Sequence, residues 1–199
     1  HASQVPIDEA ALAKKVAALG SAVIRPVLAI YLGESQEPDH DFQVDLRVID
    51  ARPRILLTAL GLLPRSEVFQ GIDAALQEKT DVDCRLALAR ILAYLGGEPA
   101  LKSILTIASE LDPIQWERTF VQVPLQQSIA RVVGGKEKLA MAVAHRVRGS
   151  QPGLASILVR ALVEAGASPV ASELALAFGR DAGLDLCLAE ALAALGDRV

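Results

Sequence analysis

The chain has 199 residues, of which 52% are hydrophobic and only 4% aromatic, and it carries a formal net charge of −4 with an isoelectric point of about 5.4. An acidic chain lacks the dominant basic surface that phosphate binding requires, so a general nucleic-acid binder is disfavoured. Charged residues and prolines interrupt every apolar run before it reaches the roughly 18 residues that would cross a bilayer, so we expect no membrane insertion.

The first ordered segment is predicted to be a helix from about Ile7 to Leu19. Its apolar residues Leu12, Val16 and Leu19 make one stripe, and acidic residues in the first turn complement the helix dipole. A second apolar segment, Ala22 to Leu32, contains Pro26, which is expected either to kink a helix or to mark its true beginning.

Residues 33–50 are predicted to form an acidic inserted loop, since six acidic residues stand there against one basic residue. The alternating apolar positions Phe42, Val44 and Leu46 favour an extended conformation, although Phe42, Leu46 and Ile49 also fit one helix face. Three aspartates in this segment resemble a calcium-binding loop, but the glycine expected at its sixth position is missing, so we expect no metal there. These aspartates are Asp39, Asp41 and Asp45.

Two further helices are predicted before residue 80. One runs from Pro53 to Leu60, and the next follows Pro64, which interrupts the chain between them. In the second helix Val68, Ile72 and Leu76 are spaced to form one apolar stripe.

The region Asp81 to Pro113 is predicted to be a helical hairpin. Its first helix, Val82 to Leu95, is stopped by two glycines, and Pro99 suits the first turn of the second helix. Each helix has an apolar stripe with the spacing of an amphipathic helix, and neighbouring helices must cover both stripes. The stripes are Leu88, Ile91, Leu92 and Leu95, then Leu101, Ile104, Leu105 and Ala108.

After the hairpin, Trp116 and Phe120 are four residues apart and are predicted to share one helix face. Pro124 is predicted to interrupt the chain before a helix from Leu125 to Val133. Because a large aromatic near the start of a helix pair usually fills a groove to the next pair, Trp116 is predicted to be a packing residue.

Glycines that close apolar helical runs recur along the whole chain, at gaps of 41, 35, 38, 32 and 30 residues by subtraction. A period of roughly 34 residues is that of two short helices with their turns. We therefore expect turns at Gly61, Gly96, Gly134, Gly166 and Gly196. Leucines in the recurring register should be buried between helices, namely Leu88, Leu92, Leu158, Leu162, Leu188 and Leu192.

With these residues the chain resembles the tetratricopeptide-repeat family, in which the first helix of a pair ends at a glycine and a proline closes the pair. The residues that match in order are Leu88, Ala89, Leu92, Gly96, Ala108 and Pro113, and again Leu158, Leu162, Gly166, Ala171, Ala175 and Phe178. A HEAT-like repeat is the alternative. Either resemblance implies an all-α fold, a right-handed α-α superhelix of about five to six antiparallel helix pairs, in a single domain over residues 1–199.

The resemblance also implies a binding surface, because in that family the first helix of each pair lines the concave face. Positions six residues before a closing glycine are Arg90, Arg160 and Glu190, and Tyr94 and Arg131 stand closer to their glycines. We expect these residues to line a groove for a protein or peptide partner. Since arginine can hold a carboxylate with two hydrogen bonds, an acidic partner segment is favoured, of which the acidic loop at residues 34–50 is one candidate.

Motifs of catalysis are nearly absent from the sequence, which has no phosphate-binding glycine loop, no HExxH and no nucleophile elbow. The leading expectation is therefore a non-enzymatic interaction scaffold with no cofactor. One alternative is a helical enzyme subunit with a site near His145, which lacks a carboxylate nearby in sequence. Another is a nucleic-acid-binding helical repeat that uses residues 131–160, where six basic residues stand against one acid.

The two cysteines, Cys84 and Cys187, show no metal-binding spacing and are expected to be buried thiols; a disulfide is the alternative. A cytoplasmic location is expected. A secreted or periplasmic one stays open, because the chain begins at His1 and its native start is not visible. The partner's identity and the oligomeric state are not predicted from the sequence.

Overall fold

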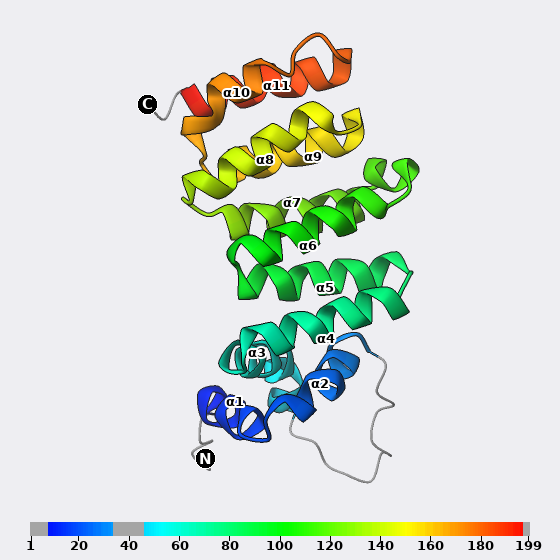
Figure 1. Ribbon diagram of the computed structural model, residues 1–199, viewed down its shortest axis with the longest axis vertical. Helices are drawn as coiled ribbons and strands as arrows, with labels where there is room; N and C mark the ends of the chain where they lie inside the picture. The colour runs from blue at the N-terminus through cyan, green and yellow to red at the C-terminus, as the bar shows by residue number, and fades with distance from the viewer. Residues whose placement is uncertain (1–7, 34–45, 197–199) are drawn as a thin grey trace. The chain divides into compact units, whose positions relative to one another are not determined.

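The computed structural model describes residues 8–33 and 46–196, in which every regular element is a helix. Eleven α-helices and three short 3₁₀ helices make up this part of the chain (Figure 1). The all-α class predicted from the sequence is thereby confirmed. None of the described helices is long and apolar enough to cross a membrane.

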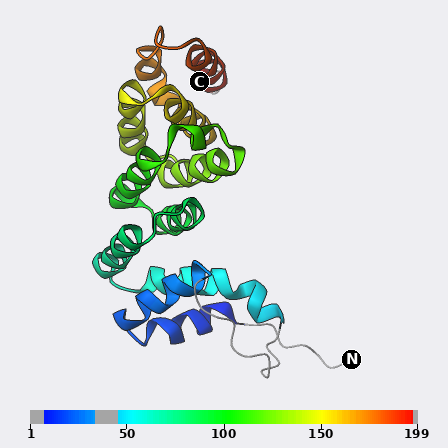
Figure 2. The same ribbon diagram turned by 90° about the vertical axis from the view of Figure 1, so that its right-hand side faces the viewer.

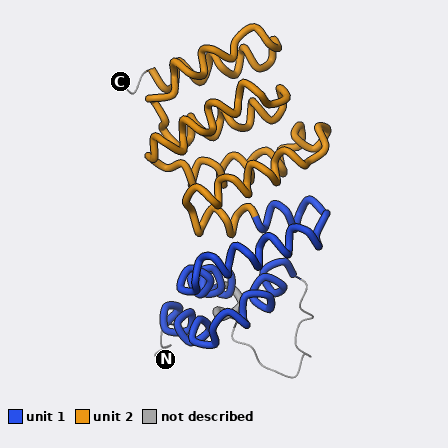
Figure 3. The backbone as a smooth tube through the Cα atoms, in the orientation of Figure 1, with its two compact units in different colours: residues 1–88 blue, residues 89–199 orange. Residues whose placement is uncertain are grey.

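The chain divides into two compact units, residues 1–88 and 89–199 (Figure 3). The expectation of one domain over residues 1–199 stays a prediction.

Unit 1 begins with the packing of α1 (Glu9–Ala17) against α3 (Leu46–Leu62). Asp8 accepts a hydrogen bond from the backbone N–H of Ala11 (2.9 Å) and so caps α1. Ala13 of α1 lies in one buried cluster with residues of α3 that are four apart, which are Ala51, Ile55 and Ala59. The predicted stripe residues Leu12 and Val16 are partly buried against this cluster. The prediction is wrong for Leu19, which follows the end of α1 and is exposed.

The other helices of unit 1 are η1 (Ser21–Val23), α2 (Ile24–Tyr31) and α4 (Arg65–Glu78), and α2 contacts both α3 and α4. Pro26 falls in the first turn of α2, where its missing N–H costs no helical hydrogen bond, so it marks the start of the helix. Gly71 lets α2 and α4 approach closely, because a Cβ added there would lie 2.5 Å from the side chain of Ile24.

The two ends of α3 differ from those expected from the sequence. Residues 46–50 were predicted to be extended, but they form the start of α3, in line with the alternative spacing of Leu46 and Ile49 on one helix face. Pro53 was expected to begin a helix and lies inside one. Gly61 was expected in a turn between helices, but it is still helical and lies near the end of α3. The helix ends just before Leu63, because Pro64 disfavours helical torsion angles in the residue that precedes it. The acidic segment 34–45, with the calcium-like aspartates, lies outside the described residues.

The predicted hairpin consists of α5 (Val82–Leu95) and α6 (Gly97–Glu110). The division between the two units falls within α5. Asp81 accepts a hydrogen bond from the backbone N–H of Cys84 (2.8 Å), and this bond lowers the pKa of the Asp81 carboxyl. Gly96 turns the chain between the helices with φ = 68°, a conformation that glycine adopts without a steric penalty. All residues of the two predicted stripes are buried except Leu105, which is half-buried.

The remaining helices of unit 2 are α7 (Thr119–Val133), α8 (Glu137–Gly149), α9 (Pro152–Glu164), α10 (Ala171–Ala175) and α11 (Ala182–Gly196). Helix α9 contacts α7, α8 and α11, while α10 contacts α8 and α11. Within this unit α7, α9 and α11 form one layer, and α6, α8 and α10 form the other (Figure 2). The apolar residues between the layers form the core.

Five of the six register leucines are fully buried, whereas Leu192 is half-buried. Leu192 lies on α11, whose main packing contacts are with α9 and α10. Gly96, Gly134 and Gly166 lie at helix ends as predicted, and Gly196 is the last residue of α11.

Two predictions for the segment after the hairpin are wrong. Trp116 and Phe120 do not share a helix face, because Trp116 belongs to the 3₁₀ helix η2 (Pro113–Glu117) and the extended residue Arg118 separates it from α7. Pro124 does not interrupt α7 but is buried inside it. The helix loses one hydrogen bond there, and the eight buried residues of α7 offset this loss.

Trp116 is a packing residue, as predicted. Its side chain is 4% exposed, and its Nε1–H donates a hydrogen bond to the backbone oxygen of Ala108 (3.0 Å). The ring lies against Gly153 of α9, where an added Cβ would be 3.3 Å from two Trp116 atoms. The indole thus joins α6, η2 and α9 within unit 2.

Replacing Leu158 with alanine is expected to lower the free energy of unfolding by about 2–5 kcal/mol, because a fully buried side chain leaves a cavity when it is truncated. Leu176→Ala is the matched control, since Leu176 is 63% exposed and should change stability little. Chemical denaturation measures both variants. Equal transition midpoints for the two would show that the burial assigned to α9 is wrong.

Gly96→Ala is expected to destabilise the chain by about 1–2 kcal/mol, because alanine is strained at a positive φ. Gly149→Ala is the control, since Gly149 has no positive φ and an added Cβ there would meet no atom within 4 Å. Thermal unfolding should show a lower midpoint for Gly96→Ala only. A similar shift for both variants would contradict the turn assigned to Gly96.

Candidate functional site

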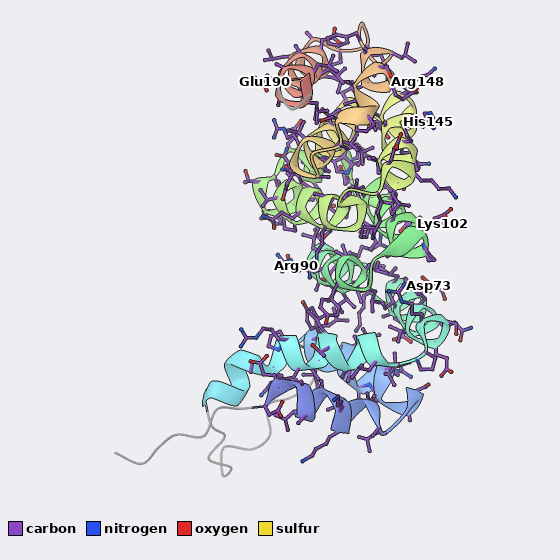
Figure 4. All side chains as sticks on the ribbon, turned by 90° about the vertical axis from the view of Figure 1, so that its left-hand side faces the viewer. Asp73, Arg90, Lys102, His145, Arg148 and Glu190 are labelled. Carbon is purple, nitrogen blue, oxygen red and sulfur yellow. The ribbon has the colours of Figure 1, made fainter. Side chains whose placement is uncertain are left out.

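The five residues predicted to bind a partner all lie in unit 2, on α5, α7, α9 and α11. Each of them is exposed: Arg90 and Tyr94 on α5, Arg131 on α7, Arg160 on α9 and Glu190 on α11. Arg90 and Glu190 lie on one side of this unit, whereas Lys102, His145 and Arg148 lie on the other (Figure 4). That these residues bind a partner stays a prediction.

Tyr94 and Arg131 are in direct contact. The guanidinium carbon of Arg131 lies 5.5 Å from the centre of the Tyr94 ring, within the range of a cation–π interaction. Tyr94 is 37% exposed, so the pair forms a platform on the surface with one aromatic face and one cation. The contact links the last turn of α5 to the last turn of α7 and restricts the orientation of Arg131.

Arg160 and Glu190 line a shared groove of about 300 Å³ that is formed by α7, α9 and α11. Val159 and Ala191 are buried along it and give it an apolar floor. The full lining consists of Gln126, Val159, Arg160, Val163, Glu164, Cys187, Glu190, Ala191 and Ala194. We call this site the α9/α11 groove.

The rim of the α9/α11 groove is of mixed charge. Arg160 stands there with two carboxylates, Glu164 and Glu190, and the side-chain amide of Gln126 donates a hydrogen bond to Glu164 (2.8 Å). The sequence-based argument did not include Glu164, although it lies four residues after Arg160 on the same helix face. A mixed rim does not favour a purely acidic partner, so this groove offers both donors and acceptors to a bound segment.

The structure does not bring Arg90 into either cluster. Arg90 is exposed on α5, and its side chain forms no hydrogen bond or ion pair with another described residue. The five predicted residues therefore form one aromatic–cation pair, one groove and one separate arginine.

His145 lies on the opposite layer and is 61% exposed. Its Nε2 is 3.7 Å from a carboxylate oxygen of Glu173 in α10, and the same oxygen accepts a hydrogen bond from Arg148 (2.9 Å). Glu173 could not be recognised from the sequence as a neighbour of His145, because it lies 28 residues further along the chain. Since Glu173 already binds Arg148 closely, the three side chains form an ion-pair cluster on the surface of α8 and α10.

The basic segment 131–160 does not form one basic face. Arg131 and Arg160 lie on α7 and α9, whereas Lys138, Arg146 and Arg148 lie on α8 in the other layer. Glu173 offsets the charge of Arg148. This division removes the main argument for nucleic-acid binding through that segment.

Within the described ranges no three His, Cys, Asp or Glu side chains are grouped closely enough to hold a metal ion. Cys84 and Cys187 do not form a disulfide; the first is half-buried and the second buried. Comparison with known proteins finds no matching family model, no matching curated protein and no matching solved structure.

A double-mutant cycle at Tyr94 and Arg131 is expected to give a coupling free energy of about 0.5–1 kcal/mol, the magnitude of an exposed cation–π pair. The variants are Tyr94→Ala, Arg131→Ala and their combination, each measured by denaturant unfolding. Arg90→Ala with Tyr94→Ala is a comparison cycle within α5. Strictly additive effects of Tyr94→Ala and Arg131→Ala would show that the two side chains do not interact in solution.

Proposed function

We propose that the chain is a non-enzymatic interaction scaffold that binds a segment of a protein partner on the exposed side of α5, α7, α9 and α11. The observation that carries this proposal is the α9/α11 groove, which has an apolar floor and a polar rim formed by residues of α7, α9 and α11. Open grooves of this kind between helices accept a peptide segment, whose apolar side chains enter the floor and whose polar groups bind the rim.

The repetitive arrangement of the sequence supports the proposal. Arg90, Arg160 and Glu190 each stand six residues before a glycine that follows or ends a helix, and all three are exposed. Equivalent positions on successive first helices of a helical repeat face the same side of the solenoid. The proposal therefore includes a superhelix of tetratricopeptide-like or HEAT-like helix pairs, with these residues on its binding face.

Tyr94 and Arg131 extend the proposed binding face beyond the groove. A tyrosine held against a guanidinium offers a partner a rigid aromatic surface at a small cost in side-chain entropy. Arg131 retains hydrogen-bond donors for a carboxylate or a backbone carbonyl of the partner. The pair and the groove supply the two kinds of contact that typically dominate protein interfaces, an aromatic anchor and an arginine.

The test is quantitative affinity capture from the source cell with the wild-type chain and with the double variant Arg131→Glu, Arg160→Glu. A partner bound on this face should be retained at least tenfold less by the double variant, because each reversed charge replaces attraction with repulsion. Lys14→Glu with Lys15→Glu, at exposed positions of α1, is the control for the same charge change and should retain the partner fully.

A photo-reactive amino acid placed at Glu190 locates the partner directly. It should cross-link to the captured protein, whereas the same group at Asp73 on α4 should not. Thermal unfolding of each variant confirms that the fold is intact. Equal retention by the double variant, or cross-linking from Asp73 alone, would contradict the proposal.

A further inference from the structure

A second groove, of about 340 Å³, lies between α6 and α8 in the other layer of unit 2. Its apolar residues are Leu101 and Leu139, which are buried, and Leu105, which is half-buried. Three cations stand around them, Lys102 on α6 and Lys138 and Arg146 on α8. The full lining is Glu98, Leu101, Lys102, Leu105, Thr106, Lys138, Leu139, Ala142 and Arg146. We call this site the α6/α8 groove.

The three cations of the α6/α8 groove are exposed, and they outnumber the one acid of its lining. None of their side chains forms an ion pair or hydrogen bond with another described residue. This distinguishes them from Arg148 on the same helix, which binds Glu173, and only one acid, Glu98, lines the groove. In a chain of net charge −4, three free cations around an apolar floor form a local site of the opposite sign.

The positions of the cations indicate an extended ligand. Lys138 and Arg146 are eight residues apart on α8, which places their backbone positions about 12 Å apart along the helix axis. Lys102 stands on the facing wall. A single carboxylate or phosphate could not contact all three cations at once. A segment with several acidic groups along its length could pair with each of them.

We propose that the α6/α8 groove binds an acidic amphipathic segment of a protein partner. Apolar side chains of that segment contact Leu101, Leu105 and Leu139, and its carboxylates bind the three cations. Arg146 offers a planar fork for a two-point contact with one carboxylate, and the lysines offer point charges.

The apolar floor distinguishes this ligand from nucleic acid. Phosphate and sugar contacts need cations and polar donors, and leucine side chains give them nothing to bind. An amphipathic helix or strand, in contrast, uses both the leucines and the cations. The α6/α8 groove is therefore a site for acidic peptide, separate from the mixed-charge α9/α11 groove.

The experiment is selection from a random peptide display library on the full chain, followed by affinity measurement of labelled selected peptides. The selected set should contain peptides in which Asp or Glu flanks apolar residues. These peptides should bind at least about tenfold more weakly to the triple variant Lys102→Glu, Lys138→Glu, Arg146→Glu, the summed effect of three exposed ion pairs that are reversed. Lys14→Glu with Lys15→Glu, at exposed positions of α1 outside both grooves, is the control for added negative charge and should leave their affinity unchanged.

A single-stranded oligonucleotide of mixed sequence serves as the competing probe. The oligonucleotide should bind weakly to the wild-type chain and should not displace the selected peptides. Selected peptides without acidic enrichment, or with equal affinity for the triple variant, would overturn the proposal. Tight oligonucleotide binding that the triple variant loses would also overturn it and assign the groove to nucleic acid.

Discussion

The burial of α9 on three sides is the constraint on which unit 2 depends. Helix α9 contacts α7, α8 and α11, and seven of its thirteen residues are buried. Leu158 and Leu162 are fully enclosed, while Ala155 and Ala161 keep side-chain volume small where neighbouring helices approach. This packing leaves only a narrow exposed strip on α9, which contains Arg160 and Glu164. Because the rest of α9 is buried, Arg160 and Glu164 are the charged groups that this helix contributes to the α9/α11 groove.

The two layers of unit 2 differ in charge. The layer with α9 and α11 offers a groove with one arginine and two glutamates, whereas the layer with α6 and α8 offers three free cations and one glutamate. A sequence count over residues 131–160 adds Arg160 to Lys138 and Arg146, although the fold places Arg160 in one layer and the other two in the opposite layer. The acidic partner first expected for the arginines of α7 and α9 thus fits the α6/α8 groove better on the grounds of charge.

Most helices were predictable from the sequence, because apolar periodicity and chain breaks act locally. Val68 and Ile72 are buried as their spacing indicated, and Gly96 turns the chain where an apolar run ends. Proline was the least reliable signal. Pro64 ends a helix, but Pro53 and Pro124 lie inside helices, since burial of the surrounding residues compensates for one lost hydrogen bond.

The candidate sites were less predictable, because they depend on contacts between residues far apart in the chain. The exposure of Arg90, Arg160 and Glu190 followed from their register beside buried leucines. Three other arrangements depend on how the helices stack. They are those of Glu173 with His145, of Arg131 with Tyr94, and of Lys102 and Lys138 across the α6/α8 groove. No local pattern in a single sequence encodes these distances.

Hydrogen exchange of the backbone amides tests the central claim about α9 most directly. If α9 is enclosed by α7, α8 and α11, the amides of residues 158–162 should be among the slowest in unit 2 and should exchange only through its global unfolding. The five-residue helix α10 should exchange faster. Exchange of residues 158–162 as fast as that of α10 would contradict the account, because a helix buried on three sides cannot open locally at that rate.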